Sequence, residues 1–402
     1  MGESLLAVVS RKPVPTWLTD HPSVDQLSVL TEPPYVASVP AGAHVETVDS
    51  IMDVEQVRRA ARRVLQAVPS TAHIVSPAEH GVMPAGFLRS VLGLPGIGFE
   101  TSLACSNKYL MKRRLRAAGL AVAEARVVDR PEDIPDAAEQ MSWPVVVKPT
   151  YGGGAVDVFR FDRRAELEAF LASDASQSLR SSPFGVVVER YVRLTDEFHI
   201  DGVVHDGAVQ FAAVSRYFVP MLGAPSQFSG SAFLPEEHPE QAPLRSLHQQ
   251  VVRAVGLEAG VTHLEVYGTG DGYVIGEIAC RPAGGGIVPA VRRAYGVDLW
   301  AAWLETSLGR DPAVTAARPT GILANYDLPV CPGRLTDLVS AEELAALPGV
   351  VDVDMLHRLG DVIGPRMHSS SALAVVYVEA PNEDKLDAAL AGIRAAFRLT
   401  VE

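Results

Sequence analysis

Two glutamates beside one turn have the clearest potential for chemistry in this sequence. Glu265 and Glu277 lie on either side of a glycine-rich turn in THLEVYGTGDGYVIGEIACRPAGGG, residues 262–286. If the turn is centred near Asp271, an antiparallel register places the two carboxylates directly opposite each other, because both are equally far from that centre. Like charges that face each other across two strands are destabilising. The spacing therefore predicts that a cation lies between them.

Alternation along the two strands predicts which side chains share the face of this carboxylate pair. Mg²⁺ fits such a face, since it binds one or two carboxylates together with phosphate oxygens. Arg281 is the alternative cation, because it would neutralise the pair without a metal. The glycine run Gly284–Gly286 favours the metal, since glycines allow a ligand to approach the backbone closely. The face is predicted to carry His263, Glu265, Tyr267, Glu277, Ala279 and Arg281, and the core to receive Leu264, Val266, Ile278 and Cys280.

Two lysines indicate phosphate binding. Lys108 lies in the first turn of a helix that we expect between a cap at Ser106 and Gly119. A cation there opposes the helix dipole unless a phosphate is bound, and a solvated surface lysine is the alternative. Lys148 ends the apolar strand PVVVK and is followed by Gly152–Gly154. That glycine run is either a loop whose N–H groups cover phosphates or a plain hairpin turn.

Glu189 repeats the pattern of Lys148, since it directly follows the apolar run VVV. Charged side chains are rarely buried unless they are paired. Lys148 and Glu189 therefore either pair with each other or face a polar ligand from opposite walls. Together with the carboxylate pair, these groups suit phosphoryl transfer, which needs positioning and charge neutralisation more than a nucleophilic side chain.

The elements that come first in the chain follow an α/β pattern. Residues 1–98 alternate the apolar runs LLAVVS, HVETV and AHIVSP with one helix, residues 54–68, whose apolar residues recur at helical spacing. This pattern predicts a small α/β domain with a parallel sheet. A second helix is expected after a cap at Asp162.

Composition excludes several classes of partner. The chain has 402 residues, 48% hydrophobic and 21% charged, with a formal net charge of −13. Nucleic acids and anionic membranes call for a basic face, so neither is an expected partner. Three widely spaced cysteines form no disulfide framework, which fits a cytoplasmic protein. The motifs GxxxxGK[ST], GxSxG and HExxH are absent.

Four stretches, taken in order, resemble the ATP-grasp superfamily, and within it the bacilysin-type L-amino acid ligases. They are SNKYLMKRRLRAAGL, PVVVKPTYGGGAVDV, VVVERYVRLTDEFHIDGVVHDG and THLEVYGTGDGYVIGEIACRPAGGG. The segments SPAEHGVMPAGFLRSVLGLPG and GILANYDLPVCPGRLTDL extend the resemblance over nearly the whole chain. It implies an ATP-grasp fold of mixed α/β (α+β) class. Its parts would be an N-terminal parallel α/β domain at 1–98, an ATP-grasp domain at 99–309 with a lid at about 122–194, and a C-terminal α/β lobe at 310–402.

The resemblance also implies roles for individual residues. ATP phosphates would be bound by Lys108 and Lys148, the second of which is also catalytic, under the loop of Gly152, Gly153 and Gly154. Adenine would be lined by Glu189, Arg190, Tyr191 and Val192, and ribose would be bound by Glu197. Mg²⁺, or Mn²⁺ as a substitute, would be held by Glu265 and Glu277. The catalytic Arg281 would stabilise the acyl phosphate, and the substrate would also meet Glu79, Gly284 and Gly285.

The sequence departs from the family pattern in two ways. Ala279 stands where many relatives have a metal-binding Asn, so metal binding rests on the two glutamates. Gln227, Ser229 and Ser231 stand near the place where some relatives carry a Glu and a His beside the acceptor amine. The glycine-loop lysine of biotin carboxylases is also absent.

The resemblance implies an ATP-dependent carboxylate-amine ligase. A carboxylate attacks the γ-phosphate to give an acyl phosphate, and an amine then displaces phosphate to form an amide or peptide bond. Its partners would be small carboxylates and amines, and homodimers occur among relatives. Two alternatives remain: a carboxylase or purine-pathway enzyme that uses bicarbonate or formate, and an ATP-binding protein without catalysis, which Ala279 permits.

Overall fold

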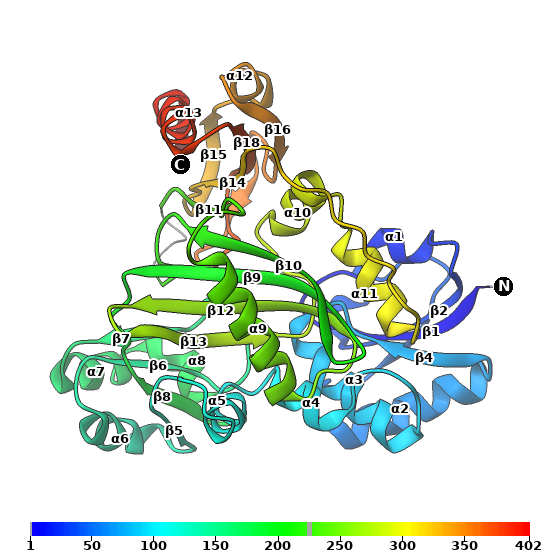
Figure 1. Cartoon of the computed structure of the whole chain (residues 1–402). Helices are drawn as coiled ribbons and strands as arrows, with labels where there is room; N and C mark the ends of the chain where they lie inside the picture. Colours follow the sequence, from blue (N-terminus) through cyan, green and yellow to red (C-terminus); the bar gives the residue numbers. More distant parts are fainter. Residues whose placement is uncertain (1, 223–226) are drawn as a thin grey trace.

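The structure is a computed structural model that describes residues 2–222 and 227–402. In this part of the chain the strands form four sheets, and helices pack against their faces (Figure 1). The expected mixture of helices with parallel and antiparallel sheets is confirmed. Within the described ranges, no helix is long and apolar enough to cross a membrane.

A four-stranded parallel sheet in the order β3-β2-β1-β4 forms the N-terminal region; the three apolar runs predicted β1, β3 and β4, and β2 was not among them. Helix α2 begins at Asp53, whose side chain accepts hydrogen bonds from two backbone N–H groups of the first turn. Its apolar stripe packs on Leu6 and Val8 of the central strand. The elements are β1 (Glu3–Val8), α1 (Thr16–Thr19), β2 (Val24–Thr31), η1 (Pro33–Ser38), β3 (His44–Thr47), α2 (Val54–Ala67), β4 (Thr71–Val75) and α3 (Glu79–Leu92).

A separate antiparallel sheet, β5-β8-β6-β7, lies within the range expected for the lid. Helix α5 precedes it, and Asn107 rather than Ser106 caps that helix, because its side chain accepts from Tyr109 and Leu110. The cap expected at Asp162 is also wrong, since α7 starts after Arg163 without a side-chain cap. The elements are α4 (Phe99–Ala104), α5 (Lys108–Ala117), β5 (Ala125–Val128), η2 (Pro131–Asp133), α6 (Ile134–Met141), β6 (Val145–Pro149), β7 (Phe159–Phe161), α7 (Arg164–Leu171), η3 (Asp174–Ser176), α8 (Gln177–Arg180) and β8 (Val186–Arg190).

The central sheet has eight strands in the order β13-β12-β9-β10-β11-β14-β18-β16. Strands of the last hundred residues thus extend the sheet that begins at β9 (Figure 1). The boundary at residue 310 stays a prediction, although the sheet runs across it. The elements are β9 (Asp196–His205), β10 (Ala208–Tyr217), β11 (Ser229–Phe233), α9 (Gln241–Val255), β12 (Gly260–Thr269), β13 (Gly272–Ala279), α10 (Ile287–Tyr295), α11 (Leu299–Ser307), β14 (Ile322–Leu328), α12 (Ala341–Ala345), β16 (Val350–Met355), β18 (Ala374–Ala380) and α13 (Glu383–Ala396). A small sheet joins β15 (Gly333–Leu338), β17 (Val362–Ile363) and β19 (Leu399–Val401).

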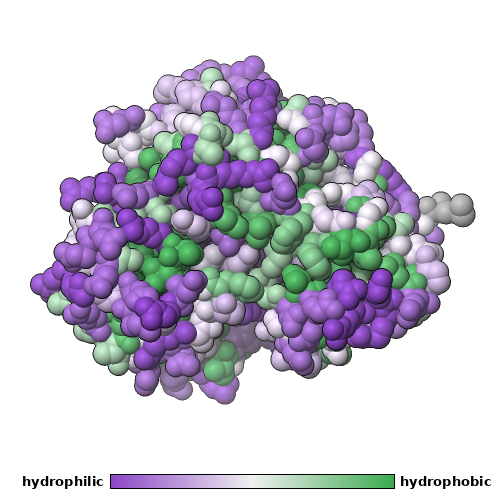
Figure 2. Space-filling model, turned by 90° about the horizontal axis from the view of Figure 1, so that it is seen from below, coloured by the Kyte–Doolittle hydropathy of each residue, from purple (hydrophilic) through white to green (hydrophobic). Residues whose placement is uncertain are grey.

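The two faces of the central sheet differ in character. One face is apolar and is covered by α5 and α9, and the predicted core residues Leu264, Val266, Ile278 and Cys280 lie there. The opposite face is apolar towards α10, α11 and the N-terminal sheet, and polar along the next rows of residues. Seen from below, the outer surface is mostly hydrophilic, and hydrophobic residues gather mainly in the middle of the view (Figure 2). The polar rows of the sheet are where chemistry is expected.

Candidate active site

The carboxylate pair has the predicted register. Glu265 on β12 lies directly opposite Glu277 on β13, and the register then shifts by one residue between Glu265 and Val266. The side-chain cation beside the pair is Lys108, which was expected at the phosphates: its Nζ lies 2.7 Å from Oε1 of Glu277 and also donates to the carbonyl of Gly152. Arg281, the alternative cation, has its ion pair elsewhere.

Lys108 is buried at the first position of α5, so it is not the solvated surface lysine of the alternative reading. Burial lowers its pKa, but the carboxylates of Glu277, Glu79 and Glu265 outweigh burial and raise the pKa above the ordinary value. A buried lysine that keeps its charge at a helix N-terminus is suited to bind an anion such as phosphate.

A second buried charge cluster contains Lys148 and Glu189. Their side chains pair with each other at 3.0 Å, which is one of the two expected arrangements. Lys112, which the sequence analysis missed, approaches the other oxygen of Glu189 at 3.5 Å and donates to the carbonyl of Gly276 at 3.0 Å. Its signal was its spacing, because residue i+4 lies on the helix face of Lys108. Burial lowers the pKa of Lys112 to about 8.

Glu189 itself stays ionised. Burial raises the pKa of its carboxyl, but Lys112 and Lys148 lower it further, so that the net pKa is below the usual value. Within the described ranges, its Oε1 atom is buried and has the ion-pair contact with Lys112 at 3.5 Å but no hydrogen bond. A carboxylate oxygen can accept more than one hydrogen bond, so a ligand amino group would fit at this atom.

Glu79 and Arg281 come together although the sequence places them in different domains. Nε of Arg281 donates to Oε2 of Glu79 at 2.5 Å, and Nη1 donates to the carbonyl of Pro282 at 2.8 Å. The glycine loop covers this pair, because a Cβ built on Gly153 would lie 3.5 Å from Nη2 of Arg281 and 3.6 Å from Cγ of Glu79. The loop over the pair also contains Gly152 and Gly154, with φ of 134° and 68°, which favour glycine.

The residues expected around adenine and ribose lie at the end of β8 and the start of β9. The backbone N–H groups of Arg190 and Tyr191 donate to other backbone carbonyls, whereas that of Val192 donates to no described backbone oxygen. Glu197 is buried, and its Oε2 accepts from the N–H of Met221 at 2.9 Å. Burial, with the Glu265 charge, raises the pKa of Glu197 to about 8. Its carboxyl is therefore able to donate as well as accept near neutral pH.

The glycine run after Arg281 lies against the C-terminal strands. The side chain of Asn325 on β14 donates to the carbonyl of Gly285 at 2.9 Å. A Cβ on Gly286 would lie 2.6 Å from a methyl group of Val375, so only glycine fits. A Cβ on Gly284 would lie 3.3 Å from Oγ of Ser370.

These groups fit a nucleotide and a divalent cation. Lys108, Lys112 and Lys148 supply buried positive charge for phosphates. Glu265 and Glu277 supply facing carboxylates, which are the hard oxygen ligands that Mg²⁺ prefers. Ala279 has no side-chain atom that could bind a metal, so on these two strands Glu265 and Glu277 are the facing carboxylates that could do so.

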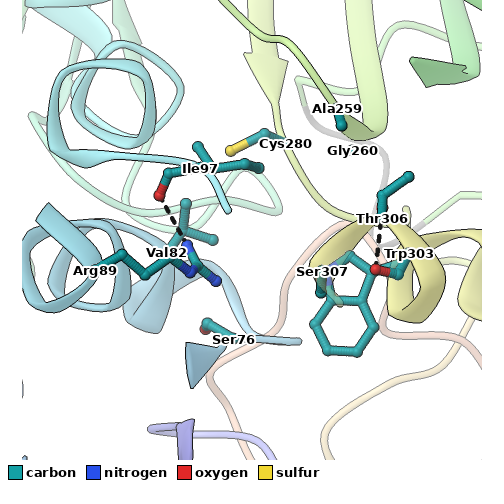
Figure 3. Close-up of a pocket in the computed structure, with 10 residues that line it drawn as sticks. All are labelled: Ser76, Val82, Arg89, Ile97, Ala259, Gly260, Cys280, Trp303, Thr306 and Ser307. Atoms are coloured by element: carbon teal, nitrogen blue, oxygen red, sulfur yellow. Dashed lines mark hydrogen bonds between the residues drawn. The ribbon is translucent and has the colours of Figure 1, made fainter. Parts of the chain in front are cut away.

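A separate cavity beside α3 does not belong to this site. It is lined by residues of α3, β12 and α11, and Arg89 reaches it while donating to the carbonyl of Ile97 at 2.9 Å (Figure 3). Its volume is about 20 Å³, which holds roughly one water molecule and no nucleotide.

Asp327 on β14 is a buried carboxyl with a testable effect on stability. It is 5% exposed, and burial raises its pKa to about 7. An acid with a raised pKa in the folded state stabilises that state only at low pH, and this contribution is lost as pH rises towards 7. Relative to the parent, the unfolding free energy of Asp327→Asn should therefore increase by about 1–3 kcal/mol as the pH rises from 4 to 8.

Urea unfolding of both proteins across this pH range measures the gain. Asp354→Asn is the matched control, because Asp354 is exposed on β16 of the same sheet. A difference between Asp327→Asn and its parent that does not change with pH would contradict the prediction.

The chain is similar in sequence to known ligases. The L-arginine-specific L-amino acid ligase of Bacillus subtilis is 33% identical to this chain. The alignment is 402 residues long and covers 98% of this chain and 97% of that protein. Residues 328–402 match the family described as L-amino acid ligase C-terminal domain 2.

Solved structures agree in fold. An L-amino acid ligase from Bacillus licheniformis matches with a TM-score of 0.76 at 19% identity, over 100% of both chains. A carboxyaminoimidazole ribonucleotide synthase from Aspergillus clavatus, complexed with ATP, matches with a TM-score of 0.71 at 15% identity, over 98% of both chains, and this likeness is one of fold alone. From its sequence relatives and its ATP-grasp fold, the chain belongs to the L-amino acid ligase family, the ATP-dependent carboxylate-amine ligases.

Proposed function

We propose that this ligase joins an amino acid, or a small carboxylic acid, to an amine through an acyl phosphate, with Glu265 and Glu277 as the Mg²⁺ ligands. The observation that carries the proposal is the facing carboxylate pair with Lys108 beside it, next to the glycine loop that covers Glu79 and Arg281. Phosphate-binding cations, metal ligands and a substrate-binding pair thus meet in one place.

Each residue of the site has a role in binding ATP that follows from its position. Lys108 and Lys148 bind the phosphates of ATP, and the loop over Gly152–Gly154 excludes water from the reacting groups. Val192 offers its backbone N–H, which donates to no described backbone oxygen, and Glu189 offers its Oε1 atom, to the adenine ring. Glu197 holds the ribose. When bound, Mg²⁺ neutralises charge on the phosphate oxygens.

The substrates meet at Arg281. The substrate carboxylate attacks the γ-phosphorus, the bond from that phosphorus to the bridging oxygen breaks, and ADP leaves. The amine then attacks the carbonyl carbon, phosphate departs with the electrons of the C–O bond, and the nitrogen loses a proton. Arg281 stabilises the negative charge on oxygen in both steps, and Glu79 binds the amino group of the first amino acid. Gly284 and Gly285 let the substrate approach the backbone.

A coupled assay tests this function. The purified protein with Mg-ATP is incubated with single amino acids and with pairs, starting with arginine because a relative is named as arginine-specific. We expect ADP and phosphate in equal amounts with a dipeptide that mass spectrometry identifies. Hydroxylamine in place of the amine should trap the acyl phosphate as a hydroxamate.

Other outcomes would point to the alternatives. ADP release that depends on bicarbonate or formate would indicate a carboxylase or a purine-pathway activity. ATP binding in a thermal-shift assay without turnover of any pair would indicate a protein that has lost catalysis.

A further inference from the structure

An unbroken chain of buried hydrogen bonds crosses the polar face of the central sheet. Its middle is His199 on β9, whose Nδ1 lies 2.6 Å from Asp201 and whose Nε2 lies 2.8 Å from Oγ of Ser231 on β11. The other oxygen of Asp201 bonds Nδ1 of His263 on β12 at 2.9 Å. Ser231 in turn donates to Oδ1 of Asn325 on β14 at 2.9 Å. The chain therefore joins four strands.

Both ends of this chain reach residues of the candidate active site. At one end Nε2 of His263 is 3.7 Å from Oε1 of Glu265, one of the two metal carboxylates. At the other end Nδ2 of Asn325 donates to the carbonyl of Gly285 at 2.9 Å. The chain thus connects the group that would hold the metal with the backbone that would meet the substrate.

Stability alone does not account for these polar groups. His199, Asp201, Ser231 and Asn325 are at most 3% exposed. Two positions further along the same strands and on the same face, Val203, Phe233 and Leu323 form an apolar core. Buried polar networks are often no more stable than apolar side chains of similar volume, so their retention indicates a need for fixed geometry.

A metal ion is a second occupant to consider for the cluster of His199, Asp201 and His263. Their ligand atoms lie within 4.8 Å of one another. Each histidine, however, bonds a different oxygen of Asp201, and both contacts have hydrogen-bond lengths. The existing hydrogen bonds account for the cluster without a metal.

We propose that His199, Asp201, Ser231 and Asn325 are positioning residues that fix the carboxylate of Glu265 relative to the backbone of Gly285. They hold the metal ligand and the substrate-binding glycine run in register across the sheet. This inference rests on the proposed function, because it assumes that Glu265 binds the metal and Gly285 meets the substrate.

Ser231→Ala removes one oxygen atom and so interrupts the chain of hydrogen bonds between His199 and Asn325. Asn325 then loses the donor that orients its amide, and His199 loses the partner of its Nε2 atom. We expect kcat/KM for the amino acid substrates to fall at least about tenfold, as for other residues that orient metal or substrate ligands. The KM for ATP should change less than twofold.

Ser215→Ala is the matched control. Ser215 lies on the adjacent β10, is 1% exposed, and its hydroxyl has no hydrogen-bond partner in the part of the chain that the structure describes. Its removal should leave kcat, KM and the melting temperature unchanged. A purely structural role of Ser231 would lower the melting temperature and leave kcat/KM as it is, which would overturn the proposal.

Asn325→Ala tests the chain by a second route. It should raise the KM for the amino acid substrates, and the double variant Ser231→Ala/Asn325→Ala should be no worse than the poorer single variant, because both cuts break the same chain. Multiplied losses would contradict the proposal, and so would stoichiometric zinc or another transition metal in the purified protein by elemental analysis. If Ser231→Ala does not fold, the result for Asn325→Ala decides alone.

Failure of the proposed function looks different. In that case the parent protein forms neither dipeptide nor hydroxamate, whereas failure of this inference leaves the parent active and the variants equally active.

Discussion

Glu277→Gln is expected to lower the rate of ADP release by about 10²–10³-fold, because a charged metal ligand becomes a neutral one. The facing Glu265 would be left as the single carboxylate, and Ala279 between Glu277 and Arg281 cannot compensate. The loss should be partly recovered by raising the concentration of Mg²⁺ or Mn²⁺. Kinetics at several metal concentrations measure both effects, and EDTA should abolish the activity of the parent protein.

Stability should fall in the same variant rather than rise. Relief of the repulsion between Glu265 and Glu277 favours a gain, but Lys108 forms its 2.7 Å ion pair with Glu277 and is buried. Breaking one side of such a pair leaves a charge without its partner, and this effect outweighs the repulsion. Asp271→Asn, at the exposed tip of the same hairpin, is the control and should change neither activity nor stability. Activity of Glu277→Gln within threefold of the parent would refute the metal assignment.

Arg281→Lys should reduce kcat by about 10²–10³-fold while the KM for ATP stays within threefold. Nε and Nη1 of Arg281 are engaged with Glu79 and Pro282, whereas Nη2 makes no hydrogen bond to a described residue and faces the glycine loop. That free donor is the one available to a developing negative charge. Burial lowers the pKa of Arg281, but Glu79 and Glu277 raise it above its ordinary value, so the charge persists at every working pH. Lysine keeps the charge but lacks the planar fork that serves Glu79 and the substrate together.

Steady-state kinetics with dipeptide and hydroxamate as separate products test this prediction. Both products should fall, because Arg281 acts on the oxygen charge in each step. Arg292→Lys, at an exposed position of α10, is the matched control and should behave as the parent. If Arg281→Lys loses only ATP affinity, Arg281 binds nucleotide and the assigned role is wrong.

Local patterns in the sequence predicted much of the fold. The apolar runs of the first 98 residues predicted a parallel sheet and three of its four strands, because an apolar strand must be buried wherever it lies; β2 was missed. Equal distances from one turn gave the pairing of Glu265 with Glu277. The ends of helices were predicted less accurately. Asn107 caps α5 in place of Ser106, because a sequence pattern does not distinguish between two adjacent polar residues that can both cap a helix.

Partners far apart in the chain were beyond such reasoning. Lys108 pairs with Glu277 across 169 residues, and Arg281 with Glu79 across 202. Lys112 was missed, since its i+4 spacing from Lys108 indicates a shared helix face but does not by itself tell a buried lysine from an exposed one in a basic helix. The extension of the central sheet by β14 and β18 has no local signature either.

The sequence by itself determined which groups exist and how each hairpin and strand presents them, because alternation and turn geometry act over a few residues. Only the tertiary structure decided which charges meet, since an ion pair or a hydrogen bond depends on distances that the packing of α5, the glycine loop and α3 against the central sheet sets. The chain from Glu265 to Gly285 illustrates the difference. Its members lie on four strands, and the close spacing of strands in one sheet is what turns separate polar residues into a connected network.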